Sequence, residues 1–115
     1  MKLIIAGGRD YELKREDYEW LDSLCAMYEV SEIVSGGATG ADAGGEQFAI
    51  SRQLPVKRFP ANWKTYGRSA GPIRNRAMAE YADAVALFPG GRGTQNMRDV
   101  AIENWLQVFE QDSAK

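Results

Sequence analysis

The sequence predicts an α/β domain with an open, mainly parallel sheet, and three observations lead to this fold class. Short, non-alternating apolar segments alternate along the chain with longer segments of helical spacing. Several of the apolar segments run directly into glycine-rich turns. The 115 residues, 44% hydrophobic and 26% charged, suffice for one core but not for two. We therefore expect a single domain over residues 1–110 and a tail over residues 111–115.

The first half of the chain predicts two strands, each followed by a helix. Residues 2–6 form a short apolar run that ends at two glycines, which is typical of a buried strand. Apolar residues at helical spacing predict a helix over residues 14–29, with its acidic side chains outward. A second strand is expected at residues 32–35, and a second helix from about residue 43 to residue 52.

The second half continues the alternation with one irregular stretch. Strands are predicted at residues 56–59 and 84–88, and residues 60–70 show no regular pattern. A helix with a proline in its first turn is expected to end near residue 81, and a last helix over residues 97–109. The order β-α-β-α-β-loop-α-β-α calls for a sheet of four to five strands covered on both faces, a Rossmann-like three-layer α/β/α domain.

Composition excludes several kinds of chemistry. The chain has no histidine, which removes catalytic triads and imidazole metal ligands, and Cys25 alone can form neither an internal disulfide nor a thiolate cluster. No apolar run approaches the length of a membrane span, so we expect a cytoplasmic protein without a membrane-embedded segment. Charge is uneven: residues 10–32 hold eight acids and two bases, whereas residues 57–79 hold six bases and no acid.

Three loops at strand ends carry the functional signal: residues 7–10, 35–42 and 89–94. Parallel sheets bind ligands beyond the carboxyl ends of their strands, and glycines allow a ligand to approach the backbone closely. Helices follow the second and third loops, so their free N–H groups and their dipoles favour an anion, above all a phosphate. Neither loop has the Lys-Ser/Thr ending of a Walker motif or a complete GxGxxG, so ATPase and ordinary dinucleotide fingerprints both fail.

Side chains near these loops suggest more specific roles. Thr39 and Thr94 can each cap a helix and donate to a phosphate oxygen. Asp42, in the first turn of a helix, suits the paired hydroxyls of a ribose. Arg74 and Arg76 bring guanidinium groups that match phosphate, but at a spacing of two residues in a helix only one is expected to face the pocket.

Four motifs, taken in order, resemble the YspA/YpsA-related branch of the SLOG superfamily. They are residues 7–11 (GGRDY), 35–42 (SGGATGAD), 71–76 (GPIRNR) and 88–94 (FPGGRGT). The resemblance covers nearly the whole chain and implies a Rossmann-like fold and nucleotide-related ligands. The superfamily includes nucleotide and nucleotide-sugar sensors, lonely-guy phosphoribohydrolases and the DNA-processing protein DprA.

The phosphoribohydrolases share a PGGxGTxxE motif and an arginine on the preceding helix. Residues 89–94 match the phosphate-loop part of that motif, and Arg74 falls where the arginine would fall. The position of the motif glutamate holds Met97 instead. The resemblance thus implies ligand binding and leaves the hydrolytic carboxylate unassigned.

The leading hypothesis is a domain that binds a nucleoside phosphate or an ADP-ribose-like molecule. Backbone amides of Gly36, Gly37, Gly91 and Gly93 would hold the phosphate with Thr94 and Arg74, Asp42 would hold the ribose, and Arg9 or Asp10 would close the rim. Asp42 and Arg74 are the candidate catalytic residues should the protein be an enzyme. The full candidate set is Gly7, Gly8, Arg9, Asp10, Ser35, Gly36, Gly37, Thr39, Gly40, Asp42, Arg74, Arg76, Pro89, Gly90, Gly91, Arg92, Gly93 and Thr94.

Two alternatives belong to other classes. The first is an N-glycoside hydrolase that releases a base from a nucleoside monophosphate, with Asp42, Asp10 or Glu46 supplying the missing carboxylate. The second is single-stranded nucleic-acid binding through residues 57–76, with Trp63 and Tyr66 stacking on bases, although overall acidity argues against it and we expect Trp63 to pack on the sheet edge.

No cofactor and no metal site are predicted, although Mg²⁺ can accompany a phosphate ligand. Homo-oligomerisation is expected, because a four-stranded sheet leaves open edges, because Trp105 and Phe109 exceed what one small core can cover, and because SLOG enzymes commonly form dimers.

Overall fold

Five strands form one parallel sheet within residues 1–111, the part of the chain that this computed structural model describes. The strands lie in the order β3-β2-β1-β4-β5, and each neighbouring pair is parallel. The predicted Rossmann-like α/β architecture is thereby confirmed. In chain order, the strands are β1 (Lys2–Ala6), β2 (Glu32–Ser35), β3 (Val56–Arg58), β4 (Ala84–Leu87) and β5 (Gln107–Glu110).

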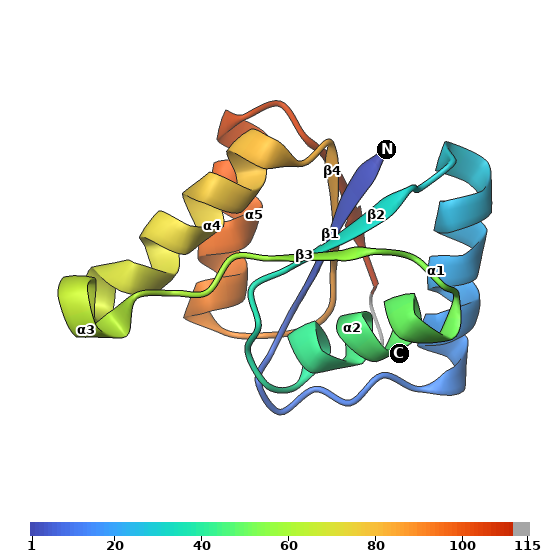
Figure 1. The fold of residues 1–115 in the computed structure, drawn as a ribbon, viewed down its shortest axis with the longest axis horizontal. Helices are drawn as coiled ribbons and strands as arrows, with labels where there is room; N and C mark the ends of the chain where they lie inside the picture. Colours follow the sequence, from blue (N-terminus) through green and yellow to red (C-terminus); the bar gives the residue numbers. More distant parts are fainter. Residues whose placement is uncertain (112–115) are drawn as a thin grey trace.

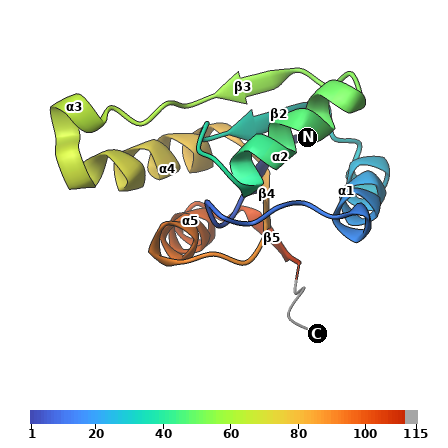
Figure 2. The same cartoon turned by 90° about the horizontal axis from the view of Figure 1, so that it is seen from below.

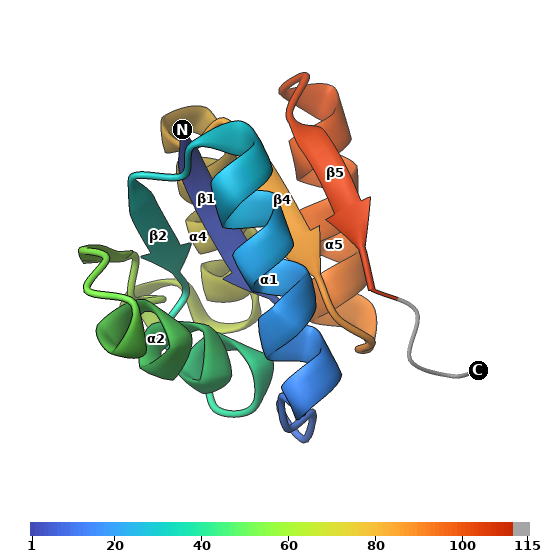
Figure 3. The ribbon, with the colours of Figure 1, turned by 90° about the vertical axis from the view of Figure 1, so that its right-hand side faces the viewer.

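Helices cover both faces of this sheet (Figures 1 and 3). Leu3 and Ile5 of β1 point to a core shared with α1 and α2, whereas Ile4 and Ala6 point to a second core under α4 and α5. Burial on both faces explains why the central strands are continuous apolar runs. The helices are α1 (Arg15–Tyr28), α2 (Ala41–Ser51), α3 (Trp63–Tyr66), α4 (Ala70–Tyr81) and α5 (Arg92–Glu103).

The last predicted helix is wrong over its second half. Helix α5 ends before Trp105, which adopts a left-handed conformation with φ of 62°, and the chain then forms β5 beside β4. Val108 packs against the α4/α5 core and Phe109 against the α1/α2 core. Neighbouring residues of a strand point to opposite faces of the sheet, as Val108 and Phe109 do. Over so short a segment, two apolar residues fit the helical spacing only by coincidence.

Residues 60–70 are also more regular than predicted. Asn62 begins helix α3, because its side chain accepts a hydrogen bond from the Thr65 N–H at 3.1 Å. A 3₁₀ turn, η1 (Gly67–Ser69), then leads into α4, which starts at Ala70. Figures 1 and 2 show α3 beyond the sheet, at the beginning of α4. This position brings Trp63 toward the carboxyl ends of the strands.

The end of β5 is tied to the rest of the sheet. Gln111 donates its backbone N–H to Leu87 O at 2.9 Å and its side-chain amide to Asp17 Oδ1 at 3.1 Å. The buried Asp17 carboxylate also accepts from the Tyr11 hydroxyl at 2.7 Å and from the Lys14 N–H at 2.9 Å. Residue 111 of the predicted tail is therefore held in place, and residues 112–115 lie outside the described part of the chain.

Two further expectations concern the surface. None of the helices within residues 1–111 has the length and the apolar character needed to cross a membrane. The sheet has two edge strands, β3 and β5, and the Trp105 side chain beside β5 is 93% exposed. Homo-oligomerisation remains a prediction.

The Asp17 network makes a prediction about stability and pH. Burial alone would raise the pKa of Asp17, but hydrogen bonds from Lys14, Tyr11 and Gln111 outweigh it and hold the pKa below the ordinary value of 3.8. The ionised carboxylate therefore stabilises the fold above that value, and this contribution is lost as the pH falls through the lower folded-state pKa. We expect Asp17→Asn to lower the free energy of unfolding by roughly 1–3 kcal/mol at pH 7.

The difference in the free energy of unfolding between the wild type and Asp17→Asn should become smaller when urea unfolding is repeated at pH 3. A gap that stays constant between pH 7 and pH 3 would show that the charge on Asp17 contributes nothing to stability.

Candidate functional site

The strand order places a crevice between the ends of β1 and β4. The chain leaves β1 toward β2 on one side and returns through β4 on the other, so the connections after these two neighbouring strands diverge. Ligands of open α/β sheets bind at such switch points, beyond the carboxyl ends of the strands. Residues 7–10 follow β1 and residues 88–91 follow β4, so two of the predicted loops flank this crevice.

The peptide groups of Gly8 join all three predicted loops. Its N–H donates to Pro89 O at 2.8 Å, and its carbonyl accepts from the Ala41 N–H at 3.0 Å. A Cβ atom on Gly8 would lie 2.9 Å from Pro89 O, and one on Gly7 would lie 2.8 Å from the Cβ of Ala41. These two glycines are needed because the loops approach one another closely, whatever the ligand.

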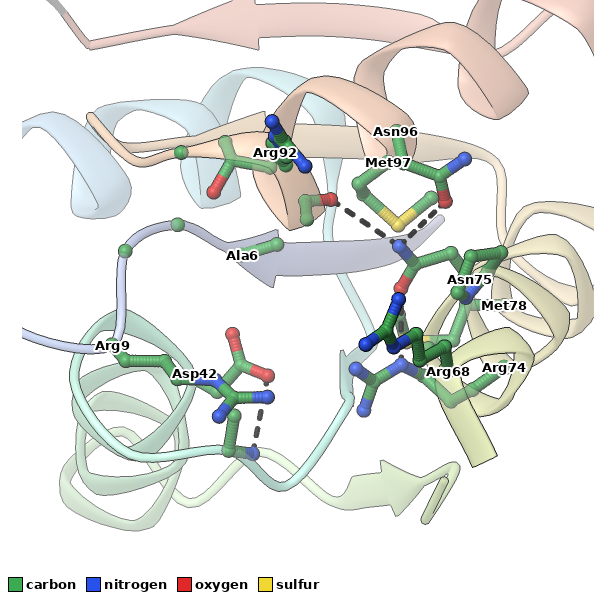
Figure 4. Close-up of a pocket in the computed structure, with 18 of the residues that line it drawn as sticks. Ala6, Arg9, Asp42, Arg68, Arg74, Asn75, Met78, Arg92, Asn96 and Met97 are labelled. Carbon is green, nitrogen blue, oxygen red and sulfur yellow. Dashed lines mark hydrogen bonds between the residues drawn. The ribbon is translucent and has the colours of Figure 1, made fainter. Parts of the chain in front are cut away.

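A cavity of about 480 Å³, here called the main cavity, opens where the three loops meet (Figure 4). In Figure 4, Arg9 and Asp42 lie on one side of it, and Arg68, Arg74 and Asn75 lie on the other. Its size is typical of a small-molecule site. It is lined by Ala6, Gly7, Gly8, Arg9, Ala38, Asp42, Trp63, Arg68, Gly71, Pro72, Arg74, Asn75, Met78, Gly91, Arg92, Gly93, Thr94, Asn96 and Met97.

The third loop offers the main cavity an open helix N-terminus. The first residues of α5, with the preceding Gly91, line the cavity, and no side chain caps this helix. The first N–H groups of an α-helix have no partner within the helix, and its dipole favours an anion there. A Cβ atom on Gly91 or Gly93 would meet nothing within 4 Å, so space adjoins the backbone at both positions. A phosphate suits this end of the cavity.

Arg74 reaches the cavity from α4, on the side opposite Asp42. Its Nη1 donates to Gly36 O at 2.5 Å and its Nε to the Asn75 side chain at 3.0 Å. Burial lowers the pKa of Arg74, although the nearby Asp42 charge opposes this, and an arginine stays protonated at neutral pH in either case. A guanidinium has five N–H donors, so those not used within the protein are available to an anion.

Among residues 1–111, Asp42 is the one carboxylate that lines the main cavity. Its side chain is buried, accepts a hydrogen bond from the Ala38 N–H at 3.2 Å, and lies close to Arg74 and Arg9. Burial raises the pKa of Asp42, and the hydrogen bond and the two arginine charges oppose that rise. Of the other carboxylates considered, Asp10 is exposed, and Glu46 accepts hydrogen bonds from Ser35 and Arg58.

In the second loop, the Gly37 amide, expected to hold a phosphate together with the Gly36 amide, is hydrogen-bonded within the protein. The Gly37 N–H donates to Ser35 Oγ at 3.0 Å, and the Ala38 N–H donates to Asp42. Ser35 in turn donates to Glu46 Oε2 at 2.6 Å, so this buried hydroxyl links the second loop to α2. The Gly37 amide is thus already satisfied within the protein.

A second hollow of about 400 Å³, here called the side cavity, adjoins the main one beyond the ends of β2 and β3. Gly36, Gly37 and Thr39 of the predicted site line this hollow instead. Trp63 lines both hollows and is 49% exposed, so it forms a wall between them and does not pack on the sheet edge as expected. The Arg9 guanidinium lies 5.8 Å from the centre of the Trp63 ring.

The remaining predicted residues lie outside both hollows. The side chains of Asp10 and Arg76 are exposed elsewhere, and Gly40 packs against the first loop, where its φ of 73° also requires glycine. Pro89 and Gly90 line a separate shallow hollow beside Glu110. As expected from its spacing, one of the two arginines of α4 faces the cavity.

Sequence reasoning missed several polar and apolar cavity residues. Buried Asn75 donates to Gly93 O at 3.3 Å and to Asn96 Oδ1 at 2.9 Å, which fixes α4 against the first turn of α5. Its position next to Arg74 in the GPIRNR motif is the signal that could have identified it. Met97, at the position of the motif glutamate, is 1% exposed and lines the cavity with Met78. Among residues 1–111, no three histidine, cysteine or acidic side chains form a group that could hold a metal ion.

The fold and the cavity at its switch point define a Rossmann-like α/β domain with a cavity of small-molecule size at the carboxyl edge of its sheet. The family model of the YspA, cpYpsA-related SLOG family matches residues 1–66, more than half of the chain, and the chain belongs to this family. The match ends before Arg74 and the third loop. Neither curated protein sequences nor solved structures give a match.

Two glycine substitutions should differ in their effect on the free energy of unfolding. A Cβ atom on Gly90 would lie 2.7 Å from the Gly8 nitrogen and 2.9 Å from the Thr94 Cβ, whereas one on Gly93 would meet nothing within 4 Å. We expect Gly90→Ala to lower the free energy of unfolding by about 1–3 kcal/mol. Gly93→Ala should leave it unchanged or raise it by up to about 1 kcal/mol, because alanine favours the helix.

Urea unfolding of the two variants beside the wild type provides the measurement. Equal losses in both variants would mean that the loops do not meet as closely at Gly90 as the structure has it.

Proposed function

We propose that this protein binds a nucleotide or nucleotide derivative, with a phosphate at the N-terminus of α5 and a ribose near Asp42. The observation that carries this proposal is the convergence of three loops on one cavity that combines a free helix end, the half-buried guanidinium of Arg74 and the buried carboxylate of Asp42. Membership of the SLOG family supports a nucleotide-related ligand.

Each part of the cavity matches a part of such a ligand. The α5 terminus and Arg74 supply donors for a dianionic phosphate. The Asp42 carboxylate can accept from sugar hydroxyls, and its negative charge disfavours a second phosphate at the same place. Apolar surface from Trp63, Met78 and Met97 offers a place for a base.

The binding proposal is tested by an arginine pair on one helix. We expect Arg74→Ala to weaken binding of nucleoside 5′-monophosphates about 10- to 100-fold, because it removes charge-assisted hydrogen bonds from a partly desolvated site. Arg76→Ala, on the exposed side of α4, removes the same charge and should leave the affinity unchanged. Isothermal titration calorimetry at one fixed salt concentration measures both.

Nucleoside mono- and diphosphates and ADP-ribose form the ligand panel. Absence of heat and of thermal stabilisation for every member, with wild-type protein, would refute the proposal. Equal losses in the two arginine variants would show a non-specific charge effect.

Hydrolysis of an N-glycosidic bond is a second candidate function, favoured by the position of Asp42. This carboxyl is buried at the cavity wall, its pKa is raised by burial, and Arg74 approaches from the facing helix. A carboxylate beside the sugar can stabilise the oxocarbenium-like transition state, and its placement could substitute for the glutamate that Met97 replaces.

Asp42→Asn separates binding from cleavage. If the protein is a hydrolase, release of free base from a nucleoside monophosphate should fall by about 10²-fold or more in this variant, while phosphate affinity is retained. Asp10→Asn, which changes an exposed aspartate of the first loop, is the matched control. Chromatography of the released base is the assay. Binding without any turnover in the wild type would exclude the hydrolase and leave the binding function in place.

A further inference from the structure

The side cavity has no role in the function proposed above, which needs the main cavity alone. It lies beyond β2 and β3 and shares part of its wall with the main cavity, namely Arg9, Ala38, Trp63 and Arg74. Arg9, Trp63 and Arg74 contribute long side chains to this shared wall. The two hollows are therefore separated by side chains and not by a strand or a helix.

The charged side chains that line the side cavity within residues 1–111 are all positive. Arg9, Arg58 and Arg74 line it, and none of its described lining residues is an aspartate or a glutamate. The main cavity, by contrast, includes Asp42 among its arginines. The Arg9 and Arg74 charges repel each other, with Asp42 near both, and Arg58 is paired with Glu46. An anion in the hollow would be attracted by all three guanidinium groups.

Arg58 is held in place for such a role by a partner outside the hollow. Its Nε and Nη2 donate to the Glu46 carboxylate, which Ser35 also holds at 2.6 Å. Glu46 does not itself line the side cavity. Within residues 1–111, the Nη1 group of Arg58 donates to no protein atom, so its hydrogens remain for a ligand.

Two N–H groups of the second loop are already occupied: those of Gly37 and Ala38 donate to Ser35 and Asp42. The charged donors for an anion in the side cavity would be guanidinium side chains, whereas an anion in the main cavity would be held by the end of α5. The two places differ in chemistry and lie beyond different strands.

We propose that the side cavity is a second phosphate subsite, so that the ligand is a nucleotide with two phosphoryl groups, one at α5 and one among Arg9, Arg58 and Arg74. This inference rests on the proposed nucleotide-binding function and names its ligand class. Arg74, which lines both hollows, would contact both ends of such a ligand.

Three adenine nucleotides test this inference by calorimetry with the full chain: AMP, ADP and adenosine 3′,5′-bisphosphate. They share a base and differ in the number and the position of their phosphoryl groups. We expect at least one doubly phosphorylated nucleotide to bind about ten-fold or more tightly than AMP. Arg58→Met should abolish that advantage and leave the affinity for AMP unchanged. Arg15→Ala, which removes an exposed arginine of α1, should change neither affinity.

The outcomes separate the subsite from the proposed function. If AMP binds and a second phosphoryl group adds nothing, or if Arg58→Met leaves its contribution intact, the subsite is refuted and the nucleotide-binding function stands. If no nucleotide binds, both fail. Because Arg58→Met leaves Glu46 without its ion-pair partner, the double variant Glu46→Gln/Arg58→Met replaces it should the single variant fail to fold.

Discussion

The site depends on two hydrogen bonds made by the backbone of Gly8. Through its N–H to Pro89 and its carbonyl to Ala41, this residue ties the loop after β1 to the loops after β4 and β2. Loops from three strands can approach one another this closely only where side chains are missing, and Gly7, Gly8 and Gly90 supply those places. The convergence that shapes the main cavity is therefore a property of backbone packing.

Glycines of the same motifs serve different purposes. Gly8, Gly40 and Gly90 allow the loops to pack on one another, whereas Gly91 and Gly93 leave space beside the α5 terminus. A glycine-rich motif thus combines an architectural part with a part that adjoins the ligand site. The α5 terminus leaves backbone donors beside the cavity, whereas the Gly37 and Ala38 amides of the second loop donate to Ser35 and Asp42.

Electrostatics divide the cavity region into two environments. Asp42 opposes the arginines of the main cavity, and the side cavity has guanidinium groups alone among its charged lining residues within the described chain. Met97 adds apolar surface where the phosphoribohydrolase motif has a glutamate, so Asp42 is the one carboxylate in the part of the cavity lining that the structure describes. That arrangement is the basis for the proposed recognition of a phosphorylated sugar and for the choice of Asp42 in the proposed hydrolysis.

Local pattern was enough to predict the strands up to β4, helices α1, α2 and α4, and the three glycine loops with Arg74 nearby. Apolar runs, helical spacing and glycine positions can all be seen in neighbouring residues. The tertiary structure alone decided that residues 107–110 pair with β4, that Trp63 forms a cavity wall, and that Asn75 joins α4 to α5. It also decided which loop amides stay free. These outcomes depend on partners that the strand order brings together from distant parts of the chain, and no local pattern specifies them.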